Sequence, residues 1–203
     1  MDMKTHWETV YATKQPNEVS WTQERPQTSL DLINGLNLPE SAAIIDIGGG
    51  DSKLVDCLLE AGYEDITVLD ISANAIKRAQ QRLGKDAEKV TWIVCDINEF
   101  KPTKTYDVWH DRAAFHFLTT PENIAAYIAL TSKWVNEQLI IGTFSTEGPK
   151  KCSGLDITQY SKEELQHLFA ANFTPQECFT INHTTPFNTV QNFVFCSFKH
   201  KAV

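Results

Sequence analysis

The sequence predicts an α/β fold in which helices cover both faces of a mostly parallel sheet. Short apolar runs rich in β-branched residues alternate with amphipathic stretches between residues 43 and 144, which is typical of repeated strand–helix units. Further along, two segments that alternate apolar and polar residues, about 176–183 and 190–198, flank a turn region at 185–188. They predict a terminal hairpin that places one antiparallel strand near the edge of the sheet.

Local patterns predict each element in turn. Residues 1–30 are polar but carry Trp7, Tyr11 and Trp21, so we expect one or two short helices there, because disordered segments seldom contain tryptophan. The strands are short β-branched runs, expected at residues 43–47, 66–69, 90–95, 106–109 and 138–144. The helices have amphipathic spacing or capping residues and are expected at residues 30–37, 54–61, 73–83, 121–134 and 161–170.

Length and charge favour one domain and limit its partners. The 203 residues are 42% hydrophobic, enough for one core, so we expect a single domain over 1–203 with an N-terminal segment at 1–28 and the core at 40–203. The chain has 18 Lys and Arg against 26 Asp and Glu, a net charge of −8, and we expect no nucleic-acid or membrane partner. No apolar run reaches the length of a membrane span, and the first residues lack the apolar part of a secretory signal.

The cysteine pattern favours free thiols. The five cysteines are widely scattered, include no Cys-x-x-Cys pair, and occur at Cys57, Cys95, Cys152, Cys178 and Cys196. Several lie in apolar runs, where a reduced thiol behaves as a small hydrophobic group. We therefore expect a reducing cytoplasm, no disulfide and no metal site.

A glycine-rich turn follows the first expected strand. Gly48, Gly49 and Gly50 lie between Asp46 at the end of the strand and Asp51-Ser52 at the start of the next helix. Glycine lets the backbone turn tightly and approach a ligand closely, and the helix behind it offers free N–H groups. Taken alone, the turn is equally compatible with a plain connection between a strand and a helix.

Two further acids end the next strands and indicate a nucleoside ligand. Asp70 ends the second strand about 20 residues after Gly50, where an acid can accept hydrogen bonds from both ribose hydroxyls. Asp96 ends the third strand, in position to meet an adenine amino group while Ile97 covers the ring. Either carboxylate singly could be a solvated strand end. The carboxyl ends of parallel strands meet at one edge of a sheet, so together they favour a shared site.

Charge and spacing narrow the choice of nucleoside. The dinucleotide pattern Gly-x-Gly-x-x-Gly has a small third residue for helix packing, but Lys53 occupies that position here. Asp46 and Asp51 place negative charge where a pyrophosphate would lie. A diphosphate would be repelled, whereas a ligand with a sulfonium and an ammonium group would be attracted. S-adenosylmethionine fits this description better than a nicotinamide dinucleotide.

Four segments are similar to the motifs of one enzyme family. They are Ile44–Gly50 after the first strand, Val68–Ser72 at the second, Asp96-Ile97 at the third and Tyr106–Arg112 at the fourth. With them the chain resembles a class I S-adenosylmethionine-dependent methyltransferase over nearly its whole length. The resemblance implies a Rossmann-like three-layer sandwich whose seven-stranded, mostly parallel sheet has its last strand antiparallel. It also implies S-adenosylmethionine as cofactor, held by Trp21, Asp46, Gly48, Gly49, Gly50, Asp51, Ser52, Asp70, Ile71, Ser72, Asp96, Ile97 and His110.

More narrowly, the aromatic N-terminal segment and His110–Leu118 resemble small bacterial methyltransferases. A fainter likeness points to protein-lysine methyltransferases, which have a similar acidic and basic pair after strand four. The small-molecule interpretation predicts a closed pocket roofed by residues 1–25. The protein-lysine alternative predicts an open channel. Remoter alternatives are a nicotinamide-dependent oxidoreductase and a module that binds the cofactor without turnover.

The expected chemistry needs few catalytic groups. Methyl transfer from a sulfonium is an in-line displacement, so alignment supplies much of the rate, and a base is needed only for a protonated nucleophile. Candidate catalytic residues after the fourth strand are His110, Asp111 and His116, because histidine titrates near neutral pH. Alternatively, His110 contacts the cofactor backbone and Asp111 forms a structural ion pair with Arg112. The N-terminal aromatic residues are expected either as a lid over the methionine end or as a clasp packed on the core.

Overall fold

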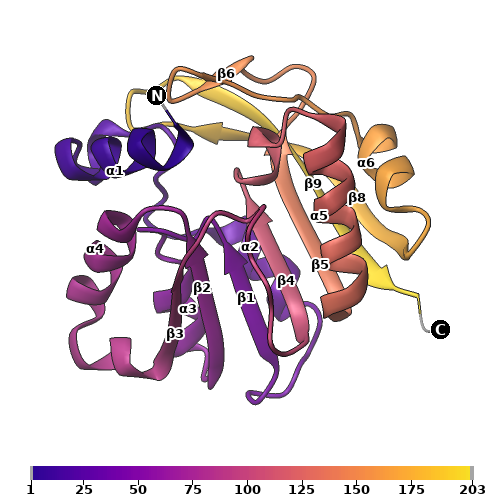
Figure 1. Cartoon of the computed structure of the whole chain (residues 1–203), viewed down its shortest axis with the longest axis horizontal. Coiled ribbons are helices and arrows are strands. Elements are labelled where there is room, and N and C mark those ends of the chain that lie inside the picture. The colour runs from indigo at the N-terminus through magenta and orange to yellow at the C-terminus, as the bar shows by residue number, and fades with distance from the viewer. Residues whose placement is uncertain (1, 202–203) are drawn as a thin grey trace.

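A seven-stranded sheet forms the middle layer of the computed structural model, which describes residues 2–201 (Figure 1). In chain order the elements are α1 (Met3–Thr13), η1 (Pro16–Glu18), α2 (Gln27–Asn34), β1 (Ala43–Ile47), α3 (Leu54–Glu60), β2 (Asp65–Asp70), α4 (Ala73–Leu83), η2 (Gly84–Lys89), β3 (Val90–Val94), β4 (Tyr106–Arg112), η3 (Phe115–Phe117), α5 (Pro121–Trp134), β5 (Val135–Phe144), β6 (Lys151–Cys152), β7 (Leu155–Asp156), α6 (Lys162–Phe169), β8 (Phe173–Thr184) and β9 (Val190–His200).

The strand order confirms the expected α/β topology. Across the sheet the strands run β3-β2-β1-β4-β5-β9-β8. The first five pair in parallel, while β9, the last strand of the chain, pairs antiparallel with both β5 and β8. The order reverses at β1, which lies between β2 and β4, and such a switch point is where ligands bind in open α/β sheets.

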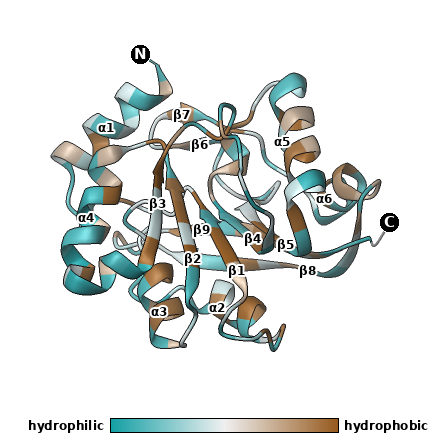
Figure 2. Cartoon of the chain, turned by 60° about the horizontal axis from the view of Figure 1, so that its bottom comes forward, coloured by the Kyte–Doolittle hydropathy of each residue, from teal (hydrophilic) through white to brown (hydrophobic). Residues whose placement is uncertain are grey.

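Alternate side chains of the strands fill two separate cores. On one face, Ile44 and Val68 pack with apolar residues of α2, α3 and α4. On the other, Ile45 and Trp109 pack with residues of α5 and α6. The central strands β1, β2 and β4 are therefore buried on both sides, and Figure 2 shows brown, hydrophobic strands between helices banded in brown and teal. This explains why the strands read as continuous apolar runs.

Local signals place the helix ends, and several boundaries differ from expectation. Ser161 and Glu164 form the expected capping box of α6. Helix α2 covers residues 27–34, earlier than the expected 30–37. Strand β4 continues through Arg112, so His110 and Asp111 lie within the strand and not in the loop after it. His110 and Asp111 each pair in register with a residue of β1 and a residue of β5, and this pairing extends β4 beyond its expected end. The short strands β6 and β7 were not expected.

The cysteine expectation was wrong in one respect. Cys178 in β8 and Cys196 in β9 are joined by a disulfide. They are direct register partners, with Cα atoms 4.2 Å apart. The other three cysteines are free thiols. The expectation of a reducing cytoplasm relied on the cysteine pattern and gains no support from this pairing. Within residues 2–201, no helix is both long and apolar enough to cross a bilayer.

Candidate active site

The glycine turn after β1 sets the geometry of the strand ends. Gly48 has a φ of 65°, and its N–H donates a hydrogen bond to the carbonyl oxygen of Leu69 at 2.8 Å. Gly50 has a φ of 40°, and a Cβ there would lie 2.6 Å from Oδ2 of Asp70. A side chain at Gly50 would therefore collide with the carboxylate that ends β2. The turn brings the start of α3 and the end of β2 together, which requires glycine.

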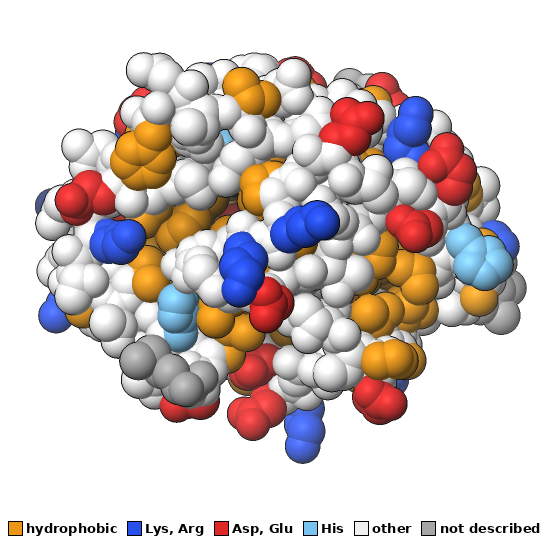
Figure 3. Space-filling model, turned by 90° about the horizontal axis from the view of Figure 1, so that it is seen from above, with side chains coloured by type: hydrophobic (Ala, Val, Ile, Leu, Met, Phe, Trp, Pro, Cys, Tyr) orange, Lys and Arg blue, Asp and Glu red, His pale blue; other side chains and the backbone are white. Residues whose placement is uncertain are grey.

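A cavity of about 890 Å³ opens at the carboxyl ends of β1, β2 and β4. Its volume lies in the upper part of the range for small-molecule sites. Helix α1 and the segment before α2 form its roof through Trp7, Tyr11 and Trp21. Figure 1 shows α1 and β6 beyond the ends of the central strands, and Figure 3 looks down on that end of the molecule.

Most of the predicted cofactor residues line this cavity. They are Trp21, Asp46, Gly48, Gly49, Asp51, Ser52, Asp70, Ile71, Asp96, Ile97 and His110. Gly50 and Ser72 lie behind the wall. Gly50 allows the approach of Asp70, while the hydroxyl of Ser72 accepts a hydrogen bond from the N–H of Ala75 and so caps α4.

The Asp70 carboxylate is buried without a cationic partner. It is 5% exposed and lines the cavity. One oxygen accepts a hydrogen bond from the N–H of Ser72 at 2.7 Å, and within residues 2–201 no Lys or Arg forms an ion pair with it. Burial raises the pKa of Asp70 to about 7. Such a carboxylate is stabilised when a ligand supplies hydrogen-bond donors.

Asp46, His110 and Ser29 form a buried hydrogen-bonded chain beside the cavity. Nδ1 of His110 lies 2.7 Å from Oδ1 of Asp46, and Nε2 lies 2.8 Å from Oγ of Ser29. The imidazole is 2% exposed, and both of its nitrogens are used inside the protein. The chain fixes the Asp46 carboxylate at the glycine turn. Its geometry favours a positioning role for His110 over a base that takes a proton from an acceptor.

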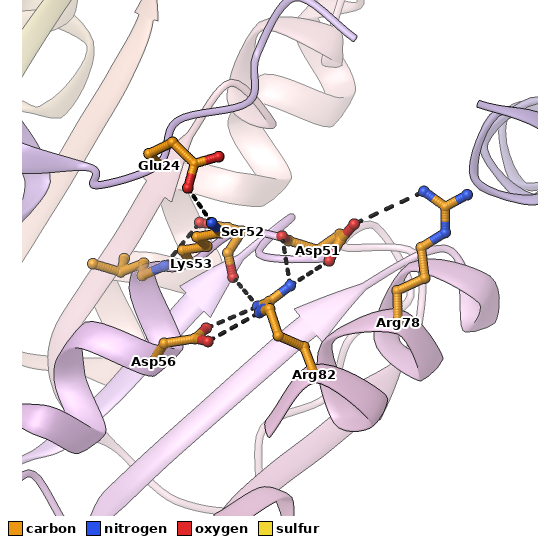
Figure 4. Close-up of polar contacts among 8 residues, drawn as sticks. Glu24, Asp51, Ser52, Lys53, Asp56, Arg78 and Arg82 are labelled. Atoms are coloured by element: carbon orange, nitrogen blue, oxygen red, sulfur yellow. Dashed lines mark hydrogen bonds and ion pairs between the residues drawn. The ribbon is translucent and has the colours of Figure 1, made fainter. Parts of the chain in front are cut away.

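Asp51 is neutralised by two arginines of α4, which was not expected. Arg82 forms an ion pair with Asp51 and also bonds both oxygens of Asp56, and Arg78 lies 3.8 Å from Asp51 (Figure 4). Lys53 likewise pairs with Glu24. The charge of Asp51 is therefore compensated within the protein, whereas Asp46, Asp70 and Asp96 line the cavity with no Lys or Arg ion pair within residues 2–201.

The structure places Asp111 and His116 away from the cavity, contrary to their expected catalytic roles. Oδ1 of Asp111 accepts hydrogen bonds from the N–H groups of Ala114 and Phe115, and Oδ2 accepts one from the Tyr127 hydroxyl. His116 is fully buried, and burial lowers its pKa to about 3. Neither residue lines the cavity, so we assign them structural roles.

The expected ion pair between Asp111 and Arg112 does not form. Successive residues of a strand point to opposite faces. Asp111 therefore turns toward Tyr127 of α5, while Arg112 lines the cavity. Sequence reasoning did not single out Ser29 or Glu8, which bond to site residues far away in the chain. Arg112 was expected within the motif at the fourth strand and as a partner of Asp111, with no ligand-binding role.

Residues 44–137 match a family model described as "Methyltransferase domain". The matched segment, somewhat under half of the chain, therefore resembles a methyltransferase domain. The chain is 38% identical over 104 residues to a malonyl-[acyl-carrier protein] O-methyltransferase of Anoxybacillus flavithermus, covering 50% of this chain and 38% of the relative. A mouse eEF1A lysine and N-terminal methyltransferase is 26% identical over 120 residues, 58% of this chain and 17% of the relative. The chain thus spans well under half of either relative's length.

The fold of the chain also has structural neighbours among solved proteins. A 1,6-didemethyltoxoflavin-N1-methyltransferase of Burkholderia thailandensis, solved with its substrate and S-adenosylhomocysteine, superposes with a TM-score of 0.72. The match covers 98% of this chain and 88% of that protein at 18% identity. At this identity the likeness shows the fold alone. The seven-stranded methyltransferase fold is therefore confirmed across nearly the whole chain.

Proposed function

We propose that this protein binds S-adenosylmethionine and transfers its methyl group to a small-molecule nucleophile. The observation that carries the proposal is the buried Asp70 carboxylate at the end of β2, which faces a ligand-sized cavity and has no cationic partner in the described part of the chain. A pair of ribose hydroxyls would supply the hydrogen bonds that this carboxylate lacks. The methyltransferase family match over residues 44–137 supports the same cofactor.

The other cofactor contacts follow the order of the strands. Asp96 and Ile97 follow β3, on the outer side of Asp70, and would face an adenine ring. Asp46 ends β1, on the inner side, and would attract the ammonium group of the methionine part. When bound, the cofactor supplies an electrophilic methyl group on a sulfonium. The chain's own residues would bind and orient it, and the aromatic roof would exclude water.

Two features favour a small acceptor over a protein side chain. Trp7 and Trp21 pack edge to face with ring centroids 5.4 Å apart, and Trp7 meets Phe117 at 5.3 Å. These rings cover the cavity on the side of the expected acceptor, where a protein-lysine enzyme needs an open channel. The B. thailandensis neighbour with a bound small substrate supports this choice, while the mouse relative keeps protein methylation as the alternative.

A turnover screen tests the proposal. The protein is incubated with S-adenosylmethionine and pools of thiols, amines, hydroxy acids and phenols, and separately with cell-extract proteins, while S-adenosylhomocysteine release is measured. We expect release above background with at least one small-molecule pool and none with the protein fraction. Release with the protein fraction alone would replace the small acceptor with a protein. No S-adenosylmethionine binding at all would overturn the proposal.

A further inference from the structure

Arg112 is a cation in the cavity wall that lacks a carboxylate partner. Its Nη1 donates a hydrogen bond to the carbonyl oxygen of Trp21 at 3.0 Å. Its Cζ lies 4.9 Å from the centroid of the Phe193 ring, which covers one face of the guanidinium. A guanidinium has five N–H donors, and in the described part of the chain no ion pair engages the others.

Three other basic residues of the cavity wall are neutralised by carboxylates, and a fourth, Lys14, has an exposed side chain. Lys53 pairs with Glu24, while Arg78 and Arg82 pair with Asp51. Arg112 differs from these three because its only hydrogen-bond acceptor within residues 2–201 is an uncharged carbonyl. Burial lowers the pKa of Arg112 to about 10, so the guanidinium still carries its charge at neutral pH.

The surroundings of Arg112 offset this charge only in part: the Asp46 carboxylate attracts the guanidinium, but the two residues form no ion pair. The Cys152 side chain is 4% exposed and lines the same cavity. Burial raises the pKa of Cys152 to about 12, so the thiol is neutral and cannot serve as the anion. Trp7, Trp21 and Phe117 supply an apolar wall nearby. A ligand anion would therefore make the direct contact with Arg112 that no carboxylate within residues 2–201 makes.

The sheet order separates Arg112 from the adenosyl end of the site. Asp96 and Asp70 follow β3 and β2, whereas Arg112 ends β4 and contacts Phe193 of β9, two strands further along the sheet. A cofactor that reaches from Asp96 to Asp46 leaves the region around Arg112 to the acceptor. Partly buried guanidinium groups bind carboxylates and phosphates strongly because the hydrogen bonds are charge-assisted and bidentate.

We propose that the methyl acceptor is an anionic small molecule with an apolar body, whose carboxylate or phosphate pairs with Arg112 while its body lies against Trp7, Trp21 and Phe117. This inference rests on the proposed function, because it takes the cavity beyond Asp46 as the acceptor site. Arg112 is then the residue that determines the charge of the substrate.

Calorimetry with a matched pair of probes tests this assignment. The protein is saturated with S-adenosylhomocysteine and titrated with 2-naphthoate, and separately with the uncharged 2-naphthamide. We expect the naphthoate to bind at least about tenfold tighter, since charge-assisted bonds are roughly twice as strong as neutral ones. Arg112→Gln should abolish this preference, and Arg112→Lys should retain part of it. Lys150→Gln, which removes an exposed charge near the rim, should leave it unchanged.

The same experiment contains the results that overturn the inference. Equal affinity of the unaltered protein for both probes would show that there is no anion site. If Arg112→Gln and Lys150→Gln lose the preference for naphthoate to the same extent, the preference reflects general charge attraction and not a site at Arg112. A tenfold loss of S-adenosylhomocysteine affinity in Arg112→Gln would assign the guanidinium to the cofactor. If the unaltered protein binds no S-adenosylhomocysteine, the proposed function fails, and the naphthoate preference of the free protein still decides the anion site. Thermal unfolding checks that each variant is folded.

Discussion

The carboxylate of Glu8 in α1 accepts a hydrogen bond from the Ser72 hydroxyl at 2.9 Å. The same carboxylate accepts bonds from the N–H groups of Ala73 and Asn74 at 2.8 and 3.0 Å. These groups form the N-terminus of α4, where free N–H donors and the helix dipole favour a negative charge. Because α1 also carries Trp7 and Tyr11, this contact holds the aromatic roof over the cavity.

Removing the Glu8 carboxylate should loosen the roof. Hydrogen bonds to a charged group contribute about 1.5–3 kcal/mol each at most, so Glu8→Ala should increase amide exchange in α1 by about tenfold or more. The measurement is hydrogen exchange followed by mass spectrometry. Exchange in α5 should not change, and Glu88→Gln, an exposed substitution in η2, serves as the control. Unaltered exchange in α1 would show that its apolar contacts alone hold it.

The cofactor affinity should fall as the pH drops below neutrality. The pKa of Asp70 is about 7 in the free protein, and the ionised carboxylate is the form that accepts two ribose hydroxyls. Binding therefore lowers this pKa, and each pH unit below about 7 should cost about tenfold in affinity until the bound carboxylate also protonates. Titration with S-adenosylhomocysteine between pH 5.5 and pH 8 measures the effect. Asp70→Asn should bind S-adenosylhomocysteine more weakly and show a flatter pH profile. The control Asp86→Asn should keep the affinity and the pH dependence of the unaltered protein.

A methyl group at Gly50 should weaken cofactor binding, whereas a methyl group at Gly84 should not. Gly50 and Gly84 both have positive φ, of 40° and 59°, so alanine strains the backbone at either site. A Cβ at Gly50 would lie 2.6 Å from Oδ2 of Asp70, while at Gly84 nothing lies within 4 Å. Gly50→Ala should therefore lose at least about tenfold in S-adenosylhomocysteine affinity, and Gly84→Ala should lose none. Equal affinities in the two variants would separate Asp70 from the cofactor.

His116→Phe should preserve turnover and leave stability unchanged or improved. Both ring nitrogens of His116 are buried without hydrogen-bond partners in the described structure, and the ring packs against Phe117 and Phe144. Replacing an unsatisfied buried polar group with an apolar one of similar shape is nearly neutral or gains about 1 kcal/mol. Denaturant unfolding measures the stability of the variant, and the turnover assay measures its activity. A large loss of turnover in a folded variant would restore His116 as a catalytic candidate.

The features read correctly from the sequence are those specified within a few residues. The glycine turn and the acids Asp70 and Asp96 follow short apolar strands, and parallel pairing alone brings their ends to one edge. Ser29, by contrast, meets His110 across 81 positions of the chain, and Glu8 meets Ser72 across 64. No local spacing indicates such contacts, because they depend on how α1 and α2 pack on the sheet.

The mistaken expectations have a related cause. Polar residues at the end of an apolar run were interpreted as a loop, yet His110 and Asp111 continue β4 because neighbouring strands on both sides pair with them. Similarly, Cys178 and Cys196 face each other only once β8 and β9 adopt their register. The sequence predicts that the charge of Asp51 is available to a ligand, but Arg82 of the next helix neutralises it.

One calorimetric comparison tests the central claim most directly. The purified protein is titrated with S-adenosylhomocysteine and, separately, with NAD. We predict single-site binding of S-adenosylhomocysteine that is at least about tenfold weaker in Asp70→Ala, and no detectable binding of NAD. Binding of NAD in preference to S-adenosylhomocysteine, or an affinity for S-adenosylhomocysteine that Asp70→Ala leaves unchanged, would contradict the assignment of this cavity to an adenosyl sulfonium cofactor.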